Sequence, residues 1–282
     1  MKKILVPTDF STEADYALEA AARIAVKAGA SIELLHIVED LPQQTFSPSG
    51  DYLPQSSMDK VFVMKLIERA HEQLLIRMMD TKMAGISLTH EVKVGNVFKQ
   101  IAQSISDKKV DLIIMGTKGA SGMQEILVGS NTEKVVRFAN CPVLSIKKKP
   151  EDFDLKKVVL AVNFEENYTS FLNKLIGWQK LFDFSLHILH VNTPLNFDTT
   201  ANVEDKKTRF SRQHQLHNYT FTIVNEYSYE EGIINFANKT KADMVVMLTH
   251  GRKGLSFFLD GSITGSMLNH ASIPVMSFRI NN

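Results

Sequence analysis

The sequence predicts an α/β protein made of two tandem copies of one domain, each built on a parallel sheet. Strand-like apolar runs alternate with helical patterns, and long segments of the first half recur in the second. The length of 282 residues allows about two domains that each bury their own core. A polar stretch at 147–154 separates the copies, so we expect domains at 1–148 and 155–282.

The repeat is clearest after the fourth expected strand of each half. There the sequence MGTKGASGMQEILVGS (115–130) aligns without a gap with MLTHGRKGLSFFLDGS (247–262). Near the front of each half, ILVPTDF (4–10) aligns with VVLAVNF (158–164). These alignments also place His36 on His190 and Asp111 on Asp243, so the second half is expected to repeat the fold of the first.

Within the first half, residues 3–6 form the continuous apolar run that is typical of a buried parallel strand. Ser11 is expected to cap the following helix, which Gly29 ends. Further strands are expected at 32–38, 86–94, 112–115 and 143–146, and further helices at 59–83, 98–106 and 131–139. Alternation at 86–94 predicts a strand near a sheet edge. Right-handed crossovers favour the flavodoxin-like strand order 3-2-1-4-5.

In this order the chain reverses direction across the sheet between the first and fourth strands, where open α/β sheets bind ligands. Pro7, Thr8 and Asp9 end the first strand, and Met115 and Gly116 end the fourth. The two strand ends are therefore expected to face each other across one crevice.

The loop after the fourth strand carries spaced glycines, which let backbone N–H groups approach an anion. We interpret Ser130 and Glu133 as a capping box that starts a helix whose N-terminus favours phosphate. The same loop offers polar or charged side chains at Thr117, Lys118, Ser130, Asn131 and Thr132. These residues favour a nucleotide or another phosphorylated ligand, with simple turn formation as the alternative role of the glycines.

The spacing Gly116-x2-Gly119-x9-Gly129-Ser130, with Pro7-Thr8-Asp9-Phe10 before it and Cys141-Pro142-Val143 after it, resembles the ATP-binding branch of the universal stress protein family. The resemblance covers both halves. It implies adenine nucleotide alpha hydrolase-like domains that form an intramolecular pseudo-dimer, in which the strands at 143–146 and 275–278 pair. It also implies a site for ATP, ADP or AMP, with Mg²⁺ between the phosphates.

The resemblance further assigns roles within this site. It implies that the backbone of Val38 reads the adenine, that Pro7, Thr8 and Asp9 contact the nucleoside, and that Gly95 lies near the ribose or base. Ribose and phosphates would be held by Gly116, Gly119, Gly129, Ser130 and Asn131. The candidate site also includes Met115, Lys118 and Thr132.

The second half departs from this pattern at the residues that face the loop. Asn163 replaces Asp9, Leu248 replaces Gly116, and Asn192 replaces Val38. The counterpart of Gly95 falls in Glu226-Tyr227-Ser228, which has no glycine. A leucine adds bulk where a ligand needs backbone contact, so we expect the second site to bind nucleotide weakly or not at all.

Several other residues have a structural interpretation that we favour over a functional one. His36 and His190 are expected to be packed or hydrogen-bonded histidines. His214 and His217 have helical spacing but no carboxylate or thiol partner, so no metal site is expected. Cys141 is expected to be buried, with redox sensing as an alternative. Phe257 and Phe258 are expected to be core or pseudo-dimer contacts, and the segments 39–58 and 194–205 to be exposed loops, with lids over the sites as the alternative.

The composition limits the classes of function. A formal net charge of +1 gives no support for a nucleic acid or membrane partner, and we see no leader or membrane span. A single cysteine favours a cytoplasmic location. We therefore expect a regulatory module of the stress response that binds an adenine nucleotide and an unknown protein partner, with a homodimer left open. The alternatives are a slow ATPase or phosphotransferase and a nucleotide-free interaction scaffold.

Overall fold

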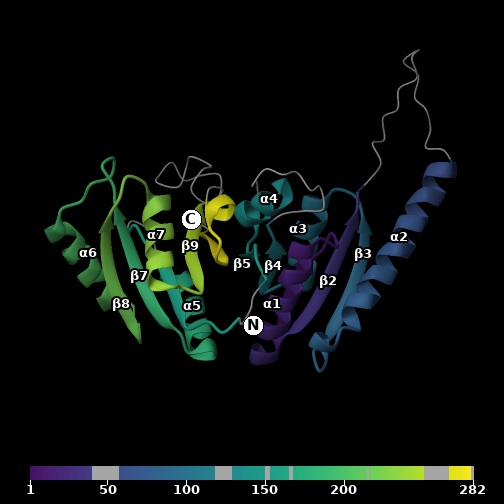
Figure 1. The fold of residues 1–282 in the computed structure, drawn as a ribbon, viewed down its shortest axis with the longest axis horizontal. Helices are drawn as coiled ribbons and strands as arrows, with labels where there is room; N and C mark the ends of the chain where they lie inside the picture. The colour runs from purple at the N-terminus through teal and green to yellow at the C-terminus, as the bar shows by residue number, and fades with distance from the viewer. Residues whose placement is uncertain are drawn as a thin grey trace, which may run out of the picture.

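The computed structural model describes residues 1–39, 57–117, 129–149, 153–164, 168–214, 216–250 and 267–280, and confirms the α/β fold (Figure 1). The first half contains β1 (Lys3–Pro7), α1 (Thr12–Ala28), β2 (Ser31–Val38), α2 (Ser57–Met78), η1 (Thr81–Met83), β3 (Leu88–Val94), α3 (Val97–Lys108), β4 (Leu112–Gly116), α4 (Ser130–Phe138) and β5 (Val143–Ile146). The second half contains β6 (Lys157–Ala161), α5 (Thr169–Phe182), β7 (Ser185–Asn192), α6 (Thr200–Gln213), β8 (Tyr219–Asn225), α7 (Tyr229–Thr240), β9 (Met244–His250) and β10 (Val275–Ile280).

The two halves share one ten-stranded sheet of order β3-β2-β1-β4-β5-β10-β9-β6-β7-β8. Within each half the strands are parallel and follow the expected order 3-2-1-4-5. At the centre, β5 and β10 pair antiparallel, with Val275 opposite Ser145 and Ser277 opposite Val143. The expected pairing of the last strands within one chain is thus confirmed, and it removes two strand edges that would otherwise be exposed.

Helices cover both faces of this sheet (Figure 1). One core cluster runs across both halves and includes Ile24 of α1, Leu74 of α2 and Leu172 of α5. The opposite face is covered by α3, α4 and α7, through Ile101, Val135 and Ile233.

The helices α1 and α5 also meet where the halves join. The ammonium group of Lys27 lies 5.0 Å from the ring centroid of Phe182. That ring in turn stacks on Trp178 at a centroid distance of 5.3 Å. Trp178 is buried, so an aromatic pair of the second half lies directly beside a helix of the first.

Two aspartates at equivalent positions of the two halves, Asp111 and Asp243, make the same hydrogen bonds. The Oδ2 atom of Asp111 accepts hydrogen bonds from the backbone amides of Lys2 and Lys3, at 2.6 and 3.1 Å. Asp243 does the same for Lys156 and Lys157, at 2.8 and 2.7 Å. Each aspartate thereby ties the start of its fourth strand to the start of its first strand.

Two expectations about the second half are wrong. Residues 200–213 form α6, with the hydroxyl of Thr199 accepting a hydrogen bond from the amide of Asn202, so the second half of the loop expected at 194–205 is helical. The same helix ends at Gln213, so His214 and His217 do not share its helical spacing. The described residues contain no group of three or more His, Cys, Asp or Glu that suits a metal ion.

Among the described residues, no helix combines the length and the apolar character that a bilayer span requires. Of the segment 39–58, only residue 39 and the start of α2 are described. Phe257 and Phe258 lie outside the described residues, so the expectations for them are not tested here.

Gly116 has a packing role that the sequence did not reveal. A Cβ atom at this position would lie 2.7 Å from the backbone carbon of Glu13 and 2.9 Å from the backbone nitrogen of Ala14. The first turn of α1 therefore packs directly on the backbone at the end of β4. In the second half α5 begins three aligned positions later than α1, and Leu248 joins the core cluster that holds Tyr168 and Phe171. The bulk of Leu248 is thus accommodated on the helix-covered face, not in the ligand loop as expected.

Replacing Gly116 with alanine is expected to lower the free energy of unfolding by about 1–3 kcal/mol, because backbone atoms of α1 must move to admit the methyl group. Gly177→Ala is the matched control, since a Cβ there meets nothing within 4 Å and Gly177 is in a helix, where alanine is favoured. Chemical denaturation of both variants checks the expectation. A Gly116→Ala protein as stable as Gly177→Ala would contradict the close approach.

Candidate functional site

A cavity of about 460 Å³ opens at the carboxyl ends of β1 and β4, where the strand order predicts a ligand site. Its described lining comprises Pro7, Thr8, Asp9, Ala14, Ile37, Glu39, Val97, Ile101, Met115, Gly116, Gly129, Ser130, Asn131 and Thr132. The end of the first strand, the end of the fourth strand and the start of α4 therefore meet around one crevice.

Most of the candidate residues line this crevice, but not all. Lys118 and Gly119 lie outside the described residues. Val38 instead lines a separate cavity of about 500 Å³ beneath α2. Its chain neighbours Ile37 and Glu39 line both cavities. The role expected of Val38 lies in its backbone, so its contact with adenine stays a prediction.

Gly95 also does not line the described part of the crevice; it makes the turn from β3 to α3. Its φ of 131° is one that L-residues with side chains rarely adopt, and its amide donates a 2.9 Å hydrogen bond to the carbonyl of Val38. Asn96 then caps α3. The second half uses three residues, 226–228, between β8 and α7, so the longer connection needs no glycine.

The start of α4 differs from the expected capping box. Gly129 is the N-cap residue, Ser130 is the first helical residue, and the N-cap residue makes no side-chain hydrogen bond to the helix. The capping-box interpretation of Ser130 and Glu133 is therefore wrong. An N-terminus without a side-chain cap leaves the first backbone N–H groups of the helix available to a ligand or to water.

Two hydrogen bonds fix α4 against the end of β4. The hydroxyl of Thr132 donates to the carbonyl of Gly116 at 3.0 Å, and the amide of Gly129 donates to the carbonyl of Thr117 at 2.9 Å. The hydroxyl of Thr132 thus has a structural partner at a position expected to contact phosphate.

Asp9 is held by the turn that leads into α1. Its Oδ1 atom accepts hydrogen bonds from the amide and the hydroxyl of Ser11, at 3.0 and 2.6 Å. The Ser11 hydroxyl in turn accepts a bond from the amide of Ala14 and caps α1, as expected. Phe10 completes the turn with a φ of 66°, which is uncommon for a residue with a bulky side chain.

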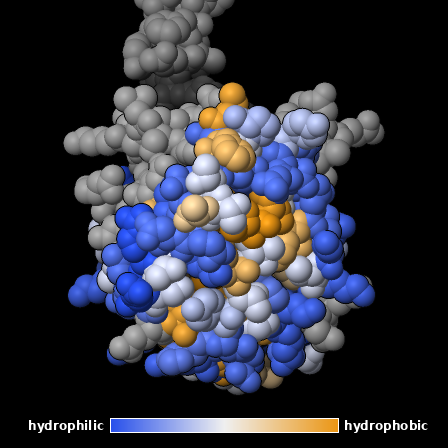
Figure 2. Space-filling view, turned by 90° about the vertical axis from the view of Figure 1, so that its left-hand side faces the viewer, coloured by the Kyte–Doolittle hydropathy of each residue, from blue (hydrophilic) through white to orange (hydrophobic). Residues whose placement is uncertain are grey.

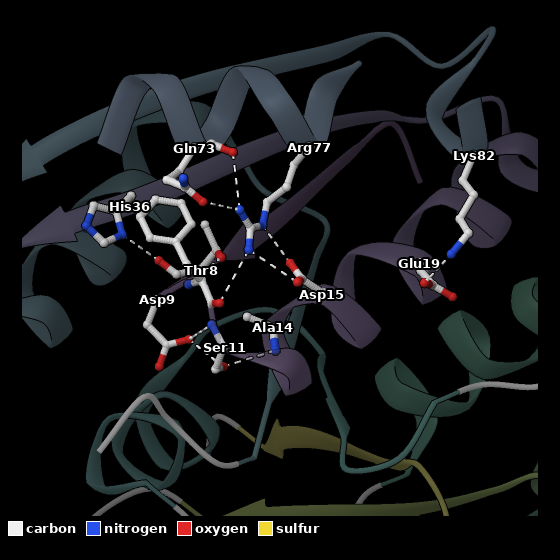
Figure 3. A network of polar contacts seen from close by, with 11 residues as sticks. Thr8, Asp9, Ser11, Ala14, Asp15, Glu19, His36, Gln73, Arg77 and Lys82 are labelled. Atoms are coloured by element: carbon white, nitrogen blue, oxygen red, sulfur yellow. Dashed lines mark hydrogen bonds and ion pairs between the residues drawn. The ribbon is translucent and has the colours of Figure 1, made fainter. Parts of the chain in front are cut away.

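A three-layer stack supports this turn from the far side (Figure 3). The ring of Phe10 stacks on His36 at a centroid distance of 4.3 Å, and the guanidinium carbon of Arg77 lies 4.9 Å from the centroid of Phe10. Arg77 binds both carboxylate oxygens of Asp15 at 2.6 and 3.2 Å and donates to the carbonyl of Phe10 at 3.3 Å. Nothing in the sequence pattern pointed to Arg77, which comes from a helix more than sixty residues away.

His36 and His190 are hydrogen-bonded histidines, as expected. The Nδ1 atom of His36 lies 2.8 Å from the carbonyl oxygen of Thr8, and that of His190 lies 3.2 Å from the carbonyl of Val162. Burial lowers the pKa of His36, although the hydrogen bond to Thr8 and the charge of Asp9 act in the opposite direction. A neutral ring with its proton on Nδ1 fits this arrangement.

In the second half the counterpart of Asp9 is engaged by protein. The Oδ1 atom of buried Asn163 accepts a 2.7 Å hydrogen bond from the hydroxyl of Tyr168, which accepts a 3.0 Å bond from the amide of Asn163. Tyr168 aligns with Ala14, one of the residues that line the first crevice. Phe164 keeps the left-handed backbone of Phe10, with a φ of 63°. The second half therefore retains the backbone turn, but the polar side chain before it, Asn163, is buried.

The counterpart of Val38 is engaged as well. Asn192 donates from Nδ2 to the carbonyl of Asp198 at 3.2 Å and accepts from the amide of Asp198 at 2.8 Å. Both substituted positions of the second half thus stabilise local structure.

Cys141 is buried, as expected. Burial raises the pKa of its thiol to about 12, so little thiolate exists at neutral pH and the redox alternative gains no support.

Fold and cavity together define a tandem α/β protein with a crevice at the switch point of its first half. The model of the universal stress protein family matches residues 1–147 and 154–279. The chain therefore belongs to the universal stress protein family, as its motifs suggested.

Individual relatives agree with this assignment. The universal stress protein MJ0577 of Methanocaldococcus jannaschii is 30% identical over 155 residues, which cover 52% of this chain and 96% of the relative. Slr1230 of Synechocystis is 25% identical and is matched along its whole length by 99% of this chain. A universal stress protein from Archaeoglobus fulgidus shares the fold, with a TM-score of 0.74, 22% identity and 98% of both chains covered.

Arg77→Lys is expected to lower the free energy of unfolding by about 1–2 kcal/mol, because lysine cannot reproduce the paired bonds to Asp15 or stack on Phe10. Arg209→Lys serves as control, since the pair of Arg209 with Asp205 is exposed on both sides and is expected to contribute little that can be measured. Urea denaturation of the two variants measures the difference. Equal midpoints would show that the stack does not support the turn.

Proposed function

We propose that the first domain binds an adenine nucleotide and that the protein acts as a regulatory module of the stress response in the cytoplasm. The observation that carries this proposal is the crevice where Asp9, the end of β4 and the α4 N-terminus without a side-chain cap converge. Its volume of about 460 Å³ lies in the range of small-molecule sites.

The lining of the crevice suits both the phosphates and the base of a nucleotide. Gly129, Ser130 and Asn131 present the start of α4, whose N–H groups and dipole favour phosphate. A Cβ at Gly129 would come no closer than 3.9 Å to protein, so this glycine keeps the backbone open to a ligand. Mg²⁺ would accompany the phosphates and neutralise part of their charge.

The remaining wall is apolar and suits a base. Ile37, Val97, Ile101 and Met115 line it, and a purine ring has the flat, largely apolar faces that such side chains contact. Asp9 also lines the crevice, and its carboxylate suits the ribose hydroxyls. We propose that the second half binds no nucleotide, since Tyr168 engages Asn163, the position that corresponds to Asp9.

We further propose that binding, not turnover, is the activity. In support, Asp9 accepts two hydrogen bonds from Ser11, which hold the carboxylate in the turn before α1 and occupy its Oδ1 atom. The alternatives are a slow ATPase or phosphotransferase and a nucleotide-free scaffold.

Titration of Mg-ATP into the full chain by calorimetry tests the proposal. We expect one site per chain, and Asp9→Asn is expected to weaken binding about tenfold or more through loss of a charged hydrogen bond. Gly129→Val is expected to weaken binding more, because its branched side chain enters the crevice. Asp205→Asn, on the exposed face of α6, is the control and is expected to bind like the wild type.

Phosphate release from the same samples separates the alternatives. Binding without turnover supports the regulatory module, and turnover that Asp9→Asn abolishes would favour the enzyme. If the wild-type protein binds no adenine nucleotide, the nucleotide-free scaffold becomes the supported alternative. Two sites per chain would contradict the proposed loss of the second site.

A further inference from the structure

A second cavity, of about 500 Å³, lies between α2 and the end of β2. We call it the α2 cavity. The helix α2 lies over β2 and β3 at the outer end of the sheet (Figure 1) and lines this cavity with Leu66, Arg69, Ala70 and Gln73. Its volume lies in the range of small-molecule sites, like that of the crevice.

The α2 cavity is distinct from the crevice. The four residues of α2 line the α2 cavity only, whereas Asp9 and the start of α4 line the crevice only. Ile37 and Glu39 line both, so the end of β2 is the wall between them. Substitutions can therefore alter the lining of one cavity and leave that of the other intact.

Much of the lining of the α2 cavity is apolar. Val38 and Ala70 are buried, and Leu66 is half-buried. The ring of Phe10 stacks on that of His36 at a centroid distance of 4.3 Å, and both residues line the cavity. The body of a ligand made of aromatic or aliphatic carbon suits these walls, because its burial removes apolar surface from water.

The two polar side chains that α2 contributes are both hydrogen-bond donors. Arg69 and Gln73 are four residues apart, so they lie on the same side of the helix. The Oε1 atom of Gln73 accepts a 3.1 Å hydrogen bond from Arg77, which leaves the amide N–H groups of Gln73 to donate (Figure 3). No residue in the described part of the chain pairs with the guanidinium of Arg69, whereas Arg77 binds Asp15. A cation and an amide donor side by side suit a carboxylate, which accepts through two oxygen atoms.

The charge of the lining favours one anionic group over several. Arg69 is the cation of the described lining, since burial lowers the pKa of His36 and its Nδ1 atom lies 2.8 Å from the carbonyl oxygen of Thr8. The acidic residue Glu39 belongs to the sheet wall, so it directs a negative group towards α2. The lining residues of α2 lie in the middle of the helix, where no free N–H groups or dipole end attract phosphate. A singly charged carboxylate therefore fits better than a phosphate chain.

The second half packs the equivalent turn differently. Phe164, the counterpart of Phe10, has the rings of Phe210 from α6 and Phe221 from β8 at centroid distances of 5.5 and 5.6 Å. Next to Phe10, α2 instead supplies the guanidinium of Arg77, 4.9 Å from the ring centroid. Figure 2 shows the end of the molecule where α6 lies, and most of its surface is hydrophilic. The fold can therefore pack large rings beside this turn, so it does not impose the open space of the first half.

We propose that the α2 cavity binds a small carboxylic acid with a ring-sized apolar body, held as its anion. The carboxylate accepts hydrogen bonds from Arg69 and Gln73, and the body lies against Val38, Leu66 and the ring of His36. Because the residues of α2 take no part in the crevice, this site does not depend on whether the crevice binds a nucleotide.

Equilibrium dialysis of the full chain against naphthoate tests the proposal, with the neutral naphthamide as the matched compound. We expect naphthoate to bind with a Kd of about 0.1–1 mM, in keeping with a ligand of its size. We expect naphthamide to bind about three- to tenfold more weakly, because it lacks the charge that Arg69 attracts.

Three variants identify the site. Arg69→Gln is expected to weaken naphthoate binding about three- to tenfold and to make the two compounds bind alike. Lys65→Gln is the matched control, because it removes a positive charge one helical turn away from an exposed residue outside the lining. Gly129→Val alters the lining of the crevice only. Both are expected to keep the affinity for naphthoate within about twofold of the wild type. Circular dichroism checks that each variant is folded.

Four outcomes would overturn the proposal. A wild type that binds neither compound up to about 5 mM excludes the site, and one that binds naphthamide as tightly as naphthoate excludes the role of Arg69. If Lys65→Gln lowers the affinity as much as Arg69→Gln, general surface charge attracts the probe and the cavity does not. A loss in Gly129→Val equal to that in Arg69→Gln places the probe in the crevice instead.

Discussion

The antiparallel pairing of β5 and β10 is the interaction on which the architecture depends. Each strand would otherwise be the exposed edge of a five-stranded sheet, and together they make one sheet and one continuous core on the side of α1, α2 and α5. The hydroxyl of Ser277 donates to the carbonyl of Val143 across this junction, in addition to the ladder of backbone bonds. The tandem arrangement thus converts two open sheet edges into an internal strand pair.

The same architecture in both halves lets the two strand-end regions diverge without loss of the fold. The left-handed turn at Phe10 recurs at Phe164, and the aspartate that ties the fourth strand to the first recurs as well. What changes is the use of the polar group in the turn. Asp9 is exposed beside a capped helix, whereas Asn163 is buried against a tyrosine that replaces Ala14. At this position the second half therefore has a buried hydrogen bond that stabilises the fold, whereas the first half has an accessible carboxylate.

Patterns along the chain predicted the fold well because they reflect burial, which is a local and periodic property. The repeat, the strand order and the intrachain pairing of the last strands were all accessible from the alternation of apolar runs and the resemblance to the family. The ends of helices and strands were predicted less accurately. For example, α3 spans Val97–Lys108, whereas the sequence predicted a helix at 98–106.

The candidate site was predicted in outline but not in its contacts. Strand ends at a switch point are a topological feature, so Asp9 and Gly116 were placed correctly beside α4. Contacts that depend on distant elements were not accessible, since no local pattern connects Arg77 to Phe10 or Tyr168 to Asn163. Gly116 shows a related limit, because a glycine required by a neighbouring helix looks the same in sequence as one required by a ligand.

The position of Trp178 has a practical consequence for spectroscopy. It is the one tryptophan of the chain, it is buried, and it stacks on the ring that Lys27 of the first half contacts. Intrinsic fluorescence therefore originates beside the contact between α1 and α5, in the half opposite the crevice. An emission change on adding a ligand to the first half would report a rearrangement transmitted between the halves, so the native protein carries its own optical probe of communication between them.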